Sequence, residues 1–233
     1  MGNSLAKLDL KIVGGKYGTV DIRASEDGRS AILLENGVKW TTLNLDTMTS
    51  VNELYSSLDL AYGDVLITGL GFGVMLRLLE QKDSVKSITV LEFSQGVIDA
   101  FLQNNKLSSK TKIIHANASD YKDDKKYDGV FLDHYEDQEY FWKVNDINTV
   151  SKNIKHDAFW AWSLEGIFYA WLMGTGRAPN SRAVRPTVTE LAPGFEKYWP
   201  EYIKIHFPEE DYLLKMDLKK VEKYVNMFFT IKR

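Results

Sequence analysis

Three glycines spaced one residue apart, Gly69, Gly71 and Gly73, follow the apolar run that begins at Val65. A stretch with so little side chain has two uses. Glycine adopts left-handed backbone conformations at low cost, so the three residues can form a tight turn between a strand and a helix. A bare backbone also lets a nucleotide-like ligand approach closely, as in the first loop of doubly wound sheets. The glycines alone leave both interpretations open.

Polar side chains end two later apolar runs. Glu92 follows the glycines by about twenty residues, where a carboxylate can accept hydrogen bonds from two ribose hydroxyls. Asn117 and Ser119 follow the run that ends at His115, and their amide and hydroxyl groups suit an adenine edge. The alternatives are a solvated glutamate at a strand end and an ordinary turn capped by short polar side chains.

Titratable groups crowd the segment after the apolar run that ends at Leu132: Asp133, His134, Glu136, Asp137 and Glu139. Crowded like charges are costly unless the groups reach solvent or a cation binds. A cationic amine or guanidinium substrate would relieve the repulsion. The last three acidic residues also suit the first turn of a following helix, where they interact favourably with the helix dipole.

These positions need a sheet that brings strand ends together. Apolar runs cover residues 64–70, 87–93, 111–117, 127–134 and 158–164. Helical patterns lie between some of these runs, at 73–82, 94–105 and 137–154. This alternation, with strands apolar on both faces, predicts an α/β fold with a parallel sheet and helices on both faces. Two C-terminal runs, 201–208 and 223–233, predict an antiparallel pair. Together they make a Rossmann-like, mostly parallel seven-stranded sheet, in which ligands bind beyond the carboxyl ends of the strands.

The first fifty residues follow a different pattern. Asp27-Gly28 and Asn36-Gly37 are typical hairpin dipeptides between short β-prone runs. We therefore expect a small antiparallel region at 1–50 and a Rossmann-like catalytic domain at 51–233. The β-prone runs cover residues 8–15, 18–25, 29–36 and 38–45, and a helix is expected within 46–63.

Composition narrows the class of protein. The 233 residues are 44% hydrophobic with a net charge of -3, which provides no global field for nucleic acid. The chain has no cysteine, and its four histidines lack HxH or HExxH spacing, so no metal site is predicted. No apolar stretch is long enough for a bilayer and no signal peptide is evident, which predicts a cytoplasmic protein without a membrane partner. The small sheet and the many aromatics are compatible with a homodimer.

Residues 62–165 resemble class I S-adenosylmethionine-dependent methyltransferases. "YDGVFLDHYE" at 127–136, followed by a strand ending in "WSLEG", is similar to guanidinoacetate methyltransferases. "LLENGVKW" ahead of "VLITGLGFG" at 65–73 instead resembles spermidine synthases, which carry a small sheet before a Rossmann-like core.

The resemblance implies S-adenosylmethionine as cofactor and a role for each site residue. The implied cofactor-binding residues are Gly69, Gly71 and Gly73 around the methionine moiety, Glu92 on the ribose, and Asn117 with Ala118 beside the adenine. Asp133 is the first candidate for the catalytic carboxylate, because its counterpart in both families ends the same strand. Glu136 is the second, where spermidine synthases often carry another acidic residue.

Two positions depart from the family patterns. Ile67 stands where many methyltransferases have an acidic residue two positions before the first glycine. Phe72 replaces the aspartate that spermidine synthases use to hold the amine of decarboxylated S-adenosylmethionine. The second departure favours the methyl donor over the aminopropyl donor. A GxGxG spacing without a further glycine also fits a dinucleotide poorly.

The sequence therefore predicts a methyltransferase acting on a small amine or guanidino nitrogen of a cationic or zwitterionic substrate. Arg177, Arg182 and Arg185, in the long connection 173–199, could grip a carboxylate of such a substrate. One alternative is an aminopropyltransferase that uses decarboxylated S-adenosylmethionine, and another is a non-catalytic nucleoside-binding interaction protein. "DHYE" after the fourth run and the net charge disfavour nucleic acid as substrate.

Overall fold

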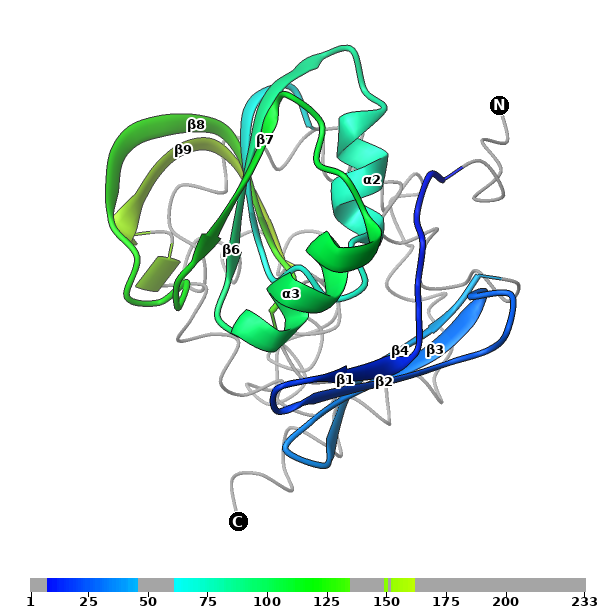
Figure 1. The fold of residues 1–233 in the computed structure, drawn as a ribbon. Coiled ribbons are helices and arrows are strands. Elements are labelled where there is room, and N and C mark those ends of the chain that lie inside the picture. Colours follow the sequence, from blue (N-terminus) through cyan, green and yellow to red (C-terminus); the bar gives the residue numbers. More distant parts are fainter. Residues whose placement is uncertain (1–7, 46–60, 135–148, 151, 162–233) are drawn as a thin grey trace, which may run out of the picture.

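Two β-sheets make up the part of the chain that the computed structural model describes, residues 8–45, 61–134, 149–150 and 152–161 (Figure 1). One sheet is antiparallel and has four strands, and the other is parallel and has five. The elements follow the chain as β1 (Gly15–Tyr17), β2 (Val20–Ala24), β3 (Ser30–Glu35), β4 (Val38–Asn44), β5 (Gly63–Thr68), α2 (Val74–Glu80), β6 (Val85–Glu92), α3 (Gln95–Asn104), β7 (Thr111–His115), β8 (Asp123–Leu132) and β9 (Ile154–Ala161).

The parallel sheet has the order β7-β6-β5-β8-β9. The chain runs outward from β5 to β7 on one side and then returns to the other side of β5 with β8. The helix α2 connects β5 to β6, and α3 connects β6 to β7. Figure 1 shows the two helices on the same side of the sheet. Right-handed connections that step across the sheet in the same direction place their helices on the same face. Neither of these helices, of seven and ten residues, is long and apolar enough to cross a bilayer.

The predicted parallel core is confirmed over its five strands, because each of the five central apolar runs contains much of one strand. Two of these strands start four residues earlier than their predicted runs. β8 begins at Asp123 in a charged stretch with alternating burial, and β9 begins at Ile154 to pair with it. The two C-terminal runs, the helix expected within 46–63 and most of the helical pattern at 137–154 lie outside the described residues.

The antiparallel sheet has its strands in chain order, β1-β2-β3-β4. Asn36 and Gly37 both have positive φ, 52° and 81°, which is the geometry that an Asn-Gly hairpin between β3 and β4 requires. The expected strand at 8–15 is wrong, since residues 8–14 form no strand and β1 begins at Gly15. Asn105 explains why: its side chain accepts a hydrogen bond from the Lys11 N–H and donates one to the Lys11 carbonyl, both at 2.9 Å, in place of a neighbouring strand.

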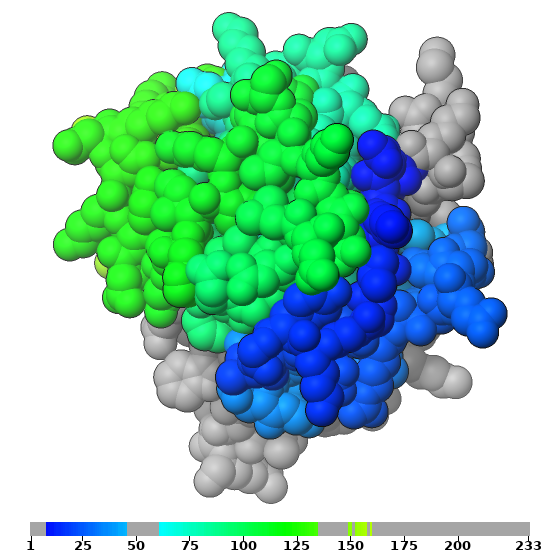
Figure 2. All heavy atoms as spheres, viewed as in Figure 1, coloured from blue at the N-terminus to red at the C-terminus, as the bar shows by residue number. Residues whose placement is uncertain are grey.

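The antiparallel sheet packs tightly against the start of α3. A Cβ at Gly96 would lie 2.3 Å from the Tyr17 carbonyl oxygen and 2.8 Å from Val20, so only glycine allows this approach. Figure 2 shows the N-terminal segments, in blue, lying directly against the green segment that contains α3. Tyr17 adds a hydrogen bond of 3.3 Å from the Asn104 amide. The small sheet is therefore joined to the helix that follows Glu92.

Gly96→Ala tests this junction through the sign of its effect on stability. Helix propensity alone would make alanine more stable by about 0.5–1 kcal/mol. Because the added methyl group meets backbone of the N-terminal sheet, we expect instead a loss of about 1–3 kcal/mol in the free energy of unfolding, measured in urea. Gln103→Ala, at an exposed position of the same helix, is the control and should stay within about 0.5 kcal/mol of wild type. A stabilised Gly96→Ala protein would contradict the packing.

Candidate functional site

The candidate site lies at the carboxyl ends of β5, β6 and β8. In open α/β sheets this edge binds ligands where the strand order reverses, which here is beside β5. The glycine loop, residues 69–73, follows β5; Glu92 ends β6; and Asp133 follows β8. The fold thus brings together three of the elements that the sequence analysis assigned to one edge.

The three glycines of the loop have different surroundings, although φ is positive at each of them. A Cβ at Gly69 would lie 2.2 Å from the Asp133 carbonyl oxygen, and one at Gly73 would lie 2.2 Å from the Phe101 ring. A Cβ at Gly71, in contrast, would meet no atom of the described residues within 4 Å. Packing therefore explains the outer two glycines. The middle one presents bare backbone that no described residue covers.

Glu92 fixes the loop from the neighbouring strand. Its Oε2 accepts a hydrogen bond of 2.7 Å from the Leu70 N–H, and its Oε1 accepts one of 2.8 Å from the Ser94 N–H. The residue is only 6% exposed, so the alternative of a solvated glutamate is wrong. Burial raises the pKa of Glu92 above its ordinary value, against the lowering effect of these backbone donors. The Phe93 N–H also interacts with this carboxylate. A carboxylate has about four acceptor positions, so some capacity is left for further donors.

Asp133 and His134 are held against the end of β5. The Asp133 N–H donates to the Thr68 carbonyl at 3.0 Å, and Thr68 Oγ1 lies 2.5 Å from His134 Nδ1. Thr68 is fully buried, and both later residues are half-buried. The His134 ring is therefore anchored to the end of β5. Because the Asp133 main chain touches Gly69, the start of this segment borders the glycine loop.

The turn after β7 holds the two residues expected beside an adenine. Asn117 Oδ1 accepts a hydrogen bond of 2.9 Å from the Ser119 N–H, and the Asn117 carbonyl accepts one from Tyr121. Ala118 is buried. Asn117 thus has the turn-capping contacts of the structural alternative, and an adenine contact stays a prediction for both residues.

Several predicted positions lie outside the described residues. They are Glu136, Asp137, Glu139 and the arginines at 177, 182 and 185. Within the part of the chain that the structure describes, no group of three or more His, Asp or Glu is arranged to hold a metal ion.

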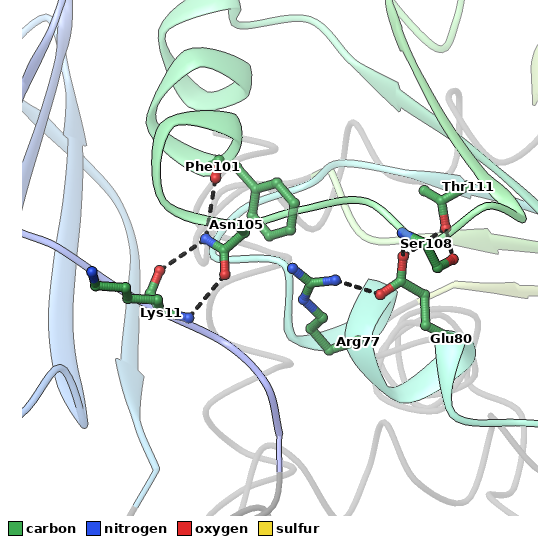
Figure 3. Close-up of polar contacts among 7 residues, drawn as sticks. All are labelled: Lys11, Arg77, Glu80, Phe101, Asn105, Ser108 and Thr111. Carbon is green, nitrogen blue, oxygen red and sulfur yellow. Dashed lines mark hydrogen bonds and ion pairs between the residues drawn. The ribbon is translucent and has the colours of Figure 1, made fainter.

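A buried polar network supports the loop from behind (Figure 3). The Phe101 ring that packs against Gly73 also lies 5.1 Å from the Arg77 guanidinium carbon. Arg77 donates to Glu80 at 2.5 Å, and Glu80 also accepts from Thr111 and from the Ser108 N–H, at 2.7 and 3.1 Å. Burial alone would raise the pKa of Glu80, but these three donors outweigh it and lower the pKa. Glu80 therefore stays ionised and holds Arg77, which in turn packs on the Phe101 ring beside Gly73.

Two contacts of the site were missed in the sequence. Ser94 is the first residue of the helical pattern predicted at 94–105, and a serine at that place is a helix N-cap signal that could have been read. Its hydroxyl accepts from the Val97 N–H at the start of α3. Thr68 is a polar residue inside an apolar run. Its hydrogen bond to His134 depends on the pairing of β5 with β8, which a local sequence pattern does not predict.

Comparisons with known proteins find several solved structures that are similar to this chain. No protein-family model matches the chain, and no curated protein matches its sequence. Similar structures include spermidine synthase from Thermotoga maritima, with 17% identity, a TM-score of 0.46, and coverage of 79% of this chain and 65% of that chain. They also include the N-methyltransferase NodS from Bradyrhizobium japonicum, with 15% identity, a TM-score of 0.36, and coverage of 47% and 62%.

A third similar structure is an S-adenosylmethionine-dependent methyltransferase from Clostridium acetobutylicum, with 16% identity, a TM-score of 0.33 and coverage of 46% of each chain. A spermidine synthase and S-adenosylmethionine-dependent methyltransferases are therefore both among the similar structures. The chain spans slightly less than two thirds of the length of the spermidine synthase. The residues of the site itself carry the functional proposal.

Alanine substitutions should distinguish a glycine required by tight packing, Gly73, from one with open space around it among the described residues, Gly71. Gly73→Ala places a methyl group inside the Phe101 ring, so we expect it to lower the free energy of unfolding by well over the roughly 1–2 kcal/mol that left-handed backbone strain costs. Gly71→Ala carries that strain alone and should fold with a loss of about 1–2 kcal/mol. Urea unfolding of both variants measures the difference, and equal losses would contradict the assignment.

Proposed function

We propose that the protein is an S-adenosylmethionine-dependent methyltransferase that alkylates a small amine or guanidino nitrogen. The observation that carries the proposal is the pairing of bare backbone at Gly71 with the buried carboxylate of Glu92, one residue away through the Leu70 N–H. A ligand that needs close backbone approach and a carboxylate for its sugar fits this pair.

The residues present suit each part of the proposed cofactor. Gly71 leaves room for the methionine and sulfonium moiety, and the acceptor positions left on Glu92 suit the two ribose hydroxyls. The turn at Asn117 and Ala118 is the proposed neighbour of the adenine. The proposal extends to the full seven-stranded sheet, with helices on both faces.

Bound S-adenosylmethionine would supply an electrophilic methyl group on sulfur. The chain's own work is to hold the acceptor nitrogen in line with that methyl group, since positioning provides most of the rate in such a displacement. Asp133 is the proposed group that orients the nitrogen and accepts its proton, with Glu136 as a second carboxylate. The hydrogen bond from the Asp133 N–H to Thr68 fixes the main chain from which the Asp133 side chain extends.

The acidic character of this edge favours a cationic substrate, or a zwitterionic one if the arginines of 173–199 also reach it. Asp133 is the described carboxylate that supports this choice. A cytoplasmic location and a homodimer are parts of the same proposal.

The N-terminal sheet favours one competing function, aminopropyl transfer from decarboxylated S-adenosylmethionine. Phe72 counts against it, because a buried phenyl ring stands where an aspartate would hold the amine. A second competitor, a binding protein without catalysis, requires Asp133 to lie away from the ligand. The contact between Gly69 and the Asp133 main chain counts against that.

Calorimetric titration with S-adenosylmethionine, S-adenosylhomocysteine, the decarboxylated donor and NAD tests the proposal. We expect the two carboxylate-bearing adenosyl ligands to bind more tightly than the other two, and a methylated product to form with small amines or guanidines. Preference for the decarboxylated donor would make the aminopropyl alternative correct. Ligand binding without product from any acceptor would support the non-catalytic alternative.

Two substitutions separate binding from chemistry. Glu92→Gln should weaken adenosyl binding by about 1–3 kcal/mol, because a charged acceptor is lost. Asp133→Asn should lower kcat while leaving cofactor affinity close to wild type. Asp83→Asn, at an exposed residue just before β6 begins, is the matched control and should change neither quantity. Wild-type behaviour of both site variants would show that the site is assigned wrongly.

A further inference from the structure

Glu35, at the tip of the N-terminal sheet, forms a hydrogen bond with the Rossmann-like part of the chain. It is the last residue of β3, directly before the Asn36–Gly37 turn. Its Oε1 accepts hydrogen bonds from Ser94 Oγ at 2.7 Å and from Thr19 Oγ1 at 3.3 Å. The first of these bonds joins residues 59 positions apart in the sequence.

Ser94 passes this contact on to the candidate site. Its hydroxyl proton goes to Glu35, its Oγ accepts from the Val97 N–H at the start of α3, and its N–H donates to Glu92 at 2.8 Å. The residue is 4% exposed, so these bonds have little competition from water. A chain of hydrogen bonds therefore runs from Glu35 through Ser94 to Glu92 and on to the Leu70 N–H of the glycine loop.

Packing on both sides of Ser94 holds this chain in place. Before it, the exposed Phe93 ring lies 6.0 Å from the ring of Trp40 on β4. After it, Gly96 lies against the Tyr17 carbonyl. A shift of the N-terminal sheet would thus move the residues directly adjoining Glu92.

We propose that Glu35 is a positioning residue of the adenosyl site, which acts through Ser94 to hold the Glu92 carboxylate against the glycine loop. The N-terminal sheet then contributes to ligand binding through Glu35, in addition to packing on α3. This inference rests on the proposed function, because it assumes that Glu92 binds the ligand.

The charge of Glu35 also acts on Glu92. Burial is the main cause of the raised pKa of Glu92, and repulsion from Glu35 adds to it. The other titratable groups nearby are His115 on β7, in register with Glu92, and Asp133 with His134 after β8. Ionised Glu92 is the better hydrogen-bond acceptor, so ligand affinity falls as pH drops through its pKa. Removing the charge of Glu35 lowers that pKa and moves the fall in affinity to lower pH.

Three variants test the proposal, with S-adenosylhomocysteine as the probe and its Kd measured from pH 5 to 8. Glu35→Ala removes both the acceptor and the charge, and should raise Kd roughly 3- to 10-fold at pH 7, the effect of one lost hydrogen bond. Glu35→Gln keeps an oxygen for Ser94, so it should bind nearly as wild type at pH 7, with its pH midpoint moved downward. Glu26→Gln, at an exposed charge in the turn between β2 and β3, should change neither the Kd nor the midpoint.

The outcomes separate this inference from the proposed function. Wild-type protein that binds no adenosyl ligand would overturn the proposed function, and the positioning role with it. Binding by the wild-type protein, combined with a Glu35→Ala Kd equal to that of Glu26→Gln, would overturn the positioning role alone. If Glu35→Ala fails to fold in a urea titration, Ser94→Ala decides instead, because it removes the hydroxyl that links Glu35 to Glu92. An unchanged Kd in that variant would overturn the positioning role.

Discussion

The carboxylate of Glu92 joins the segments on which the site depends. It accepts hydrogen bonds from the Leu70 N–H of the glycine loop and from the Ser94 N–H at the cap of α3. Burying a carboxylate is costly unless such donors compensate for lost water, and the raised pKa of Glu92 shows that burial has the larger effect. Loop, strand and helix therefore share one buried acceptor, and a change at any of them reaches the others.

The glycine loop is rigid at its ends and bare in its middle. Gly69 packs on the main chain after β8, and Gly73 packs on Phe101, whose ring is backed by Arg77 and Glu80. Gly71 lies between these fixed points with open space before it among the described residues. Tight packing thus explains Gly69 and Gly73, and Gly71 is the glycine that suits close approach of a ligand. Rigid supports around an open position are what a preorganised binding site needs.

Local patterns in the sequence predicted the parts of the fold that local chemistry determines. The Asn36–Gly37 hairpin, the strands β5 and β6 and the helix after Gly73 follow from turn propensity and apolar runs. The contact of Glu35 with Ser94 depends on how two sheets pack, which no periodicity encodes. Residues 8–14 read as a strand, but the side chain of Asn105 takes the place of a strand partner. The burial of Glu92 likewise depends on tertiary packing, which the sequence pattern does not determine.

A crystal structure with bound S-adenosylhomocysteine tests the central claim most directly. We expect both ribose hydroxyls within hydrogen-bond distance of Glu92, and the thioether portion of the ligand in van der Waals contact with the backbone of Gly71. The Leu70 and Ser94 bonds to Glu92 should stay in place. A ligand bound elsewhere, or a Gly71 position filled by the protein's own side chains, would contradict the account.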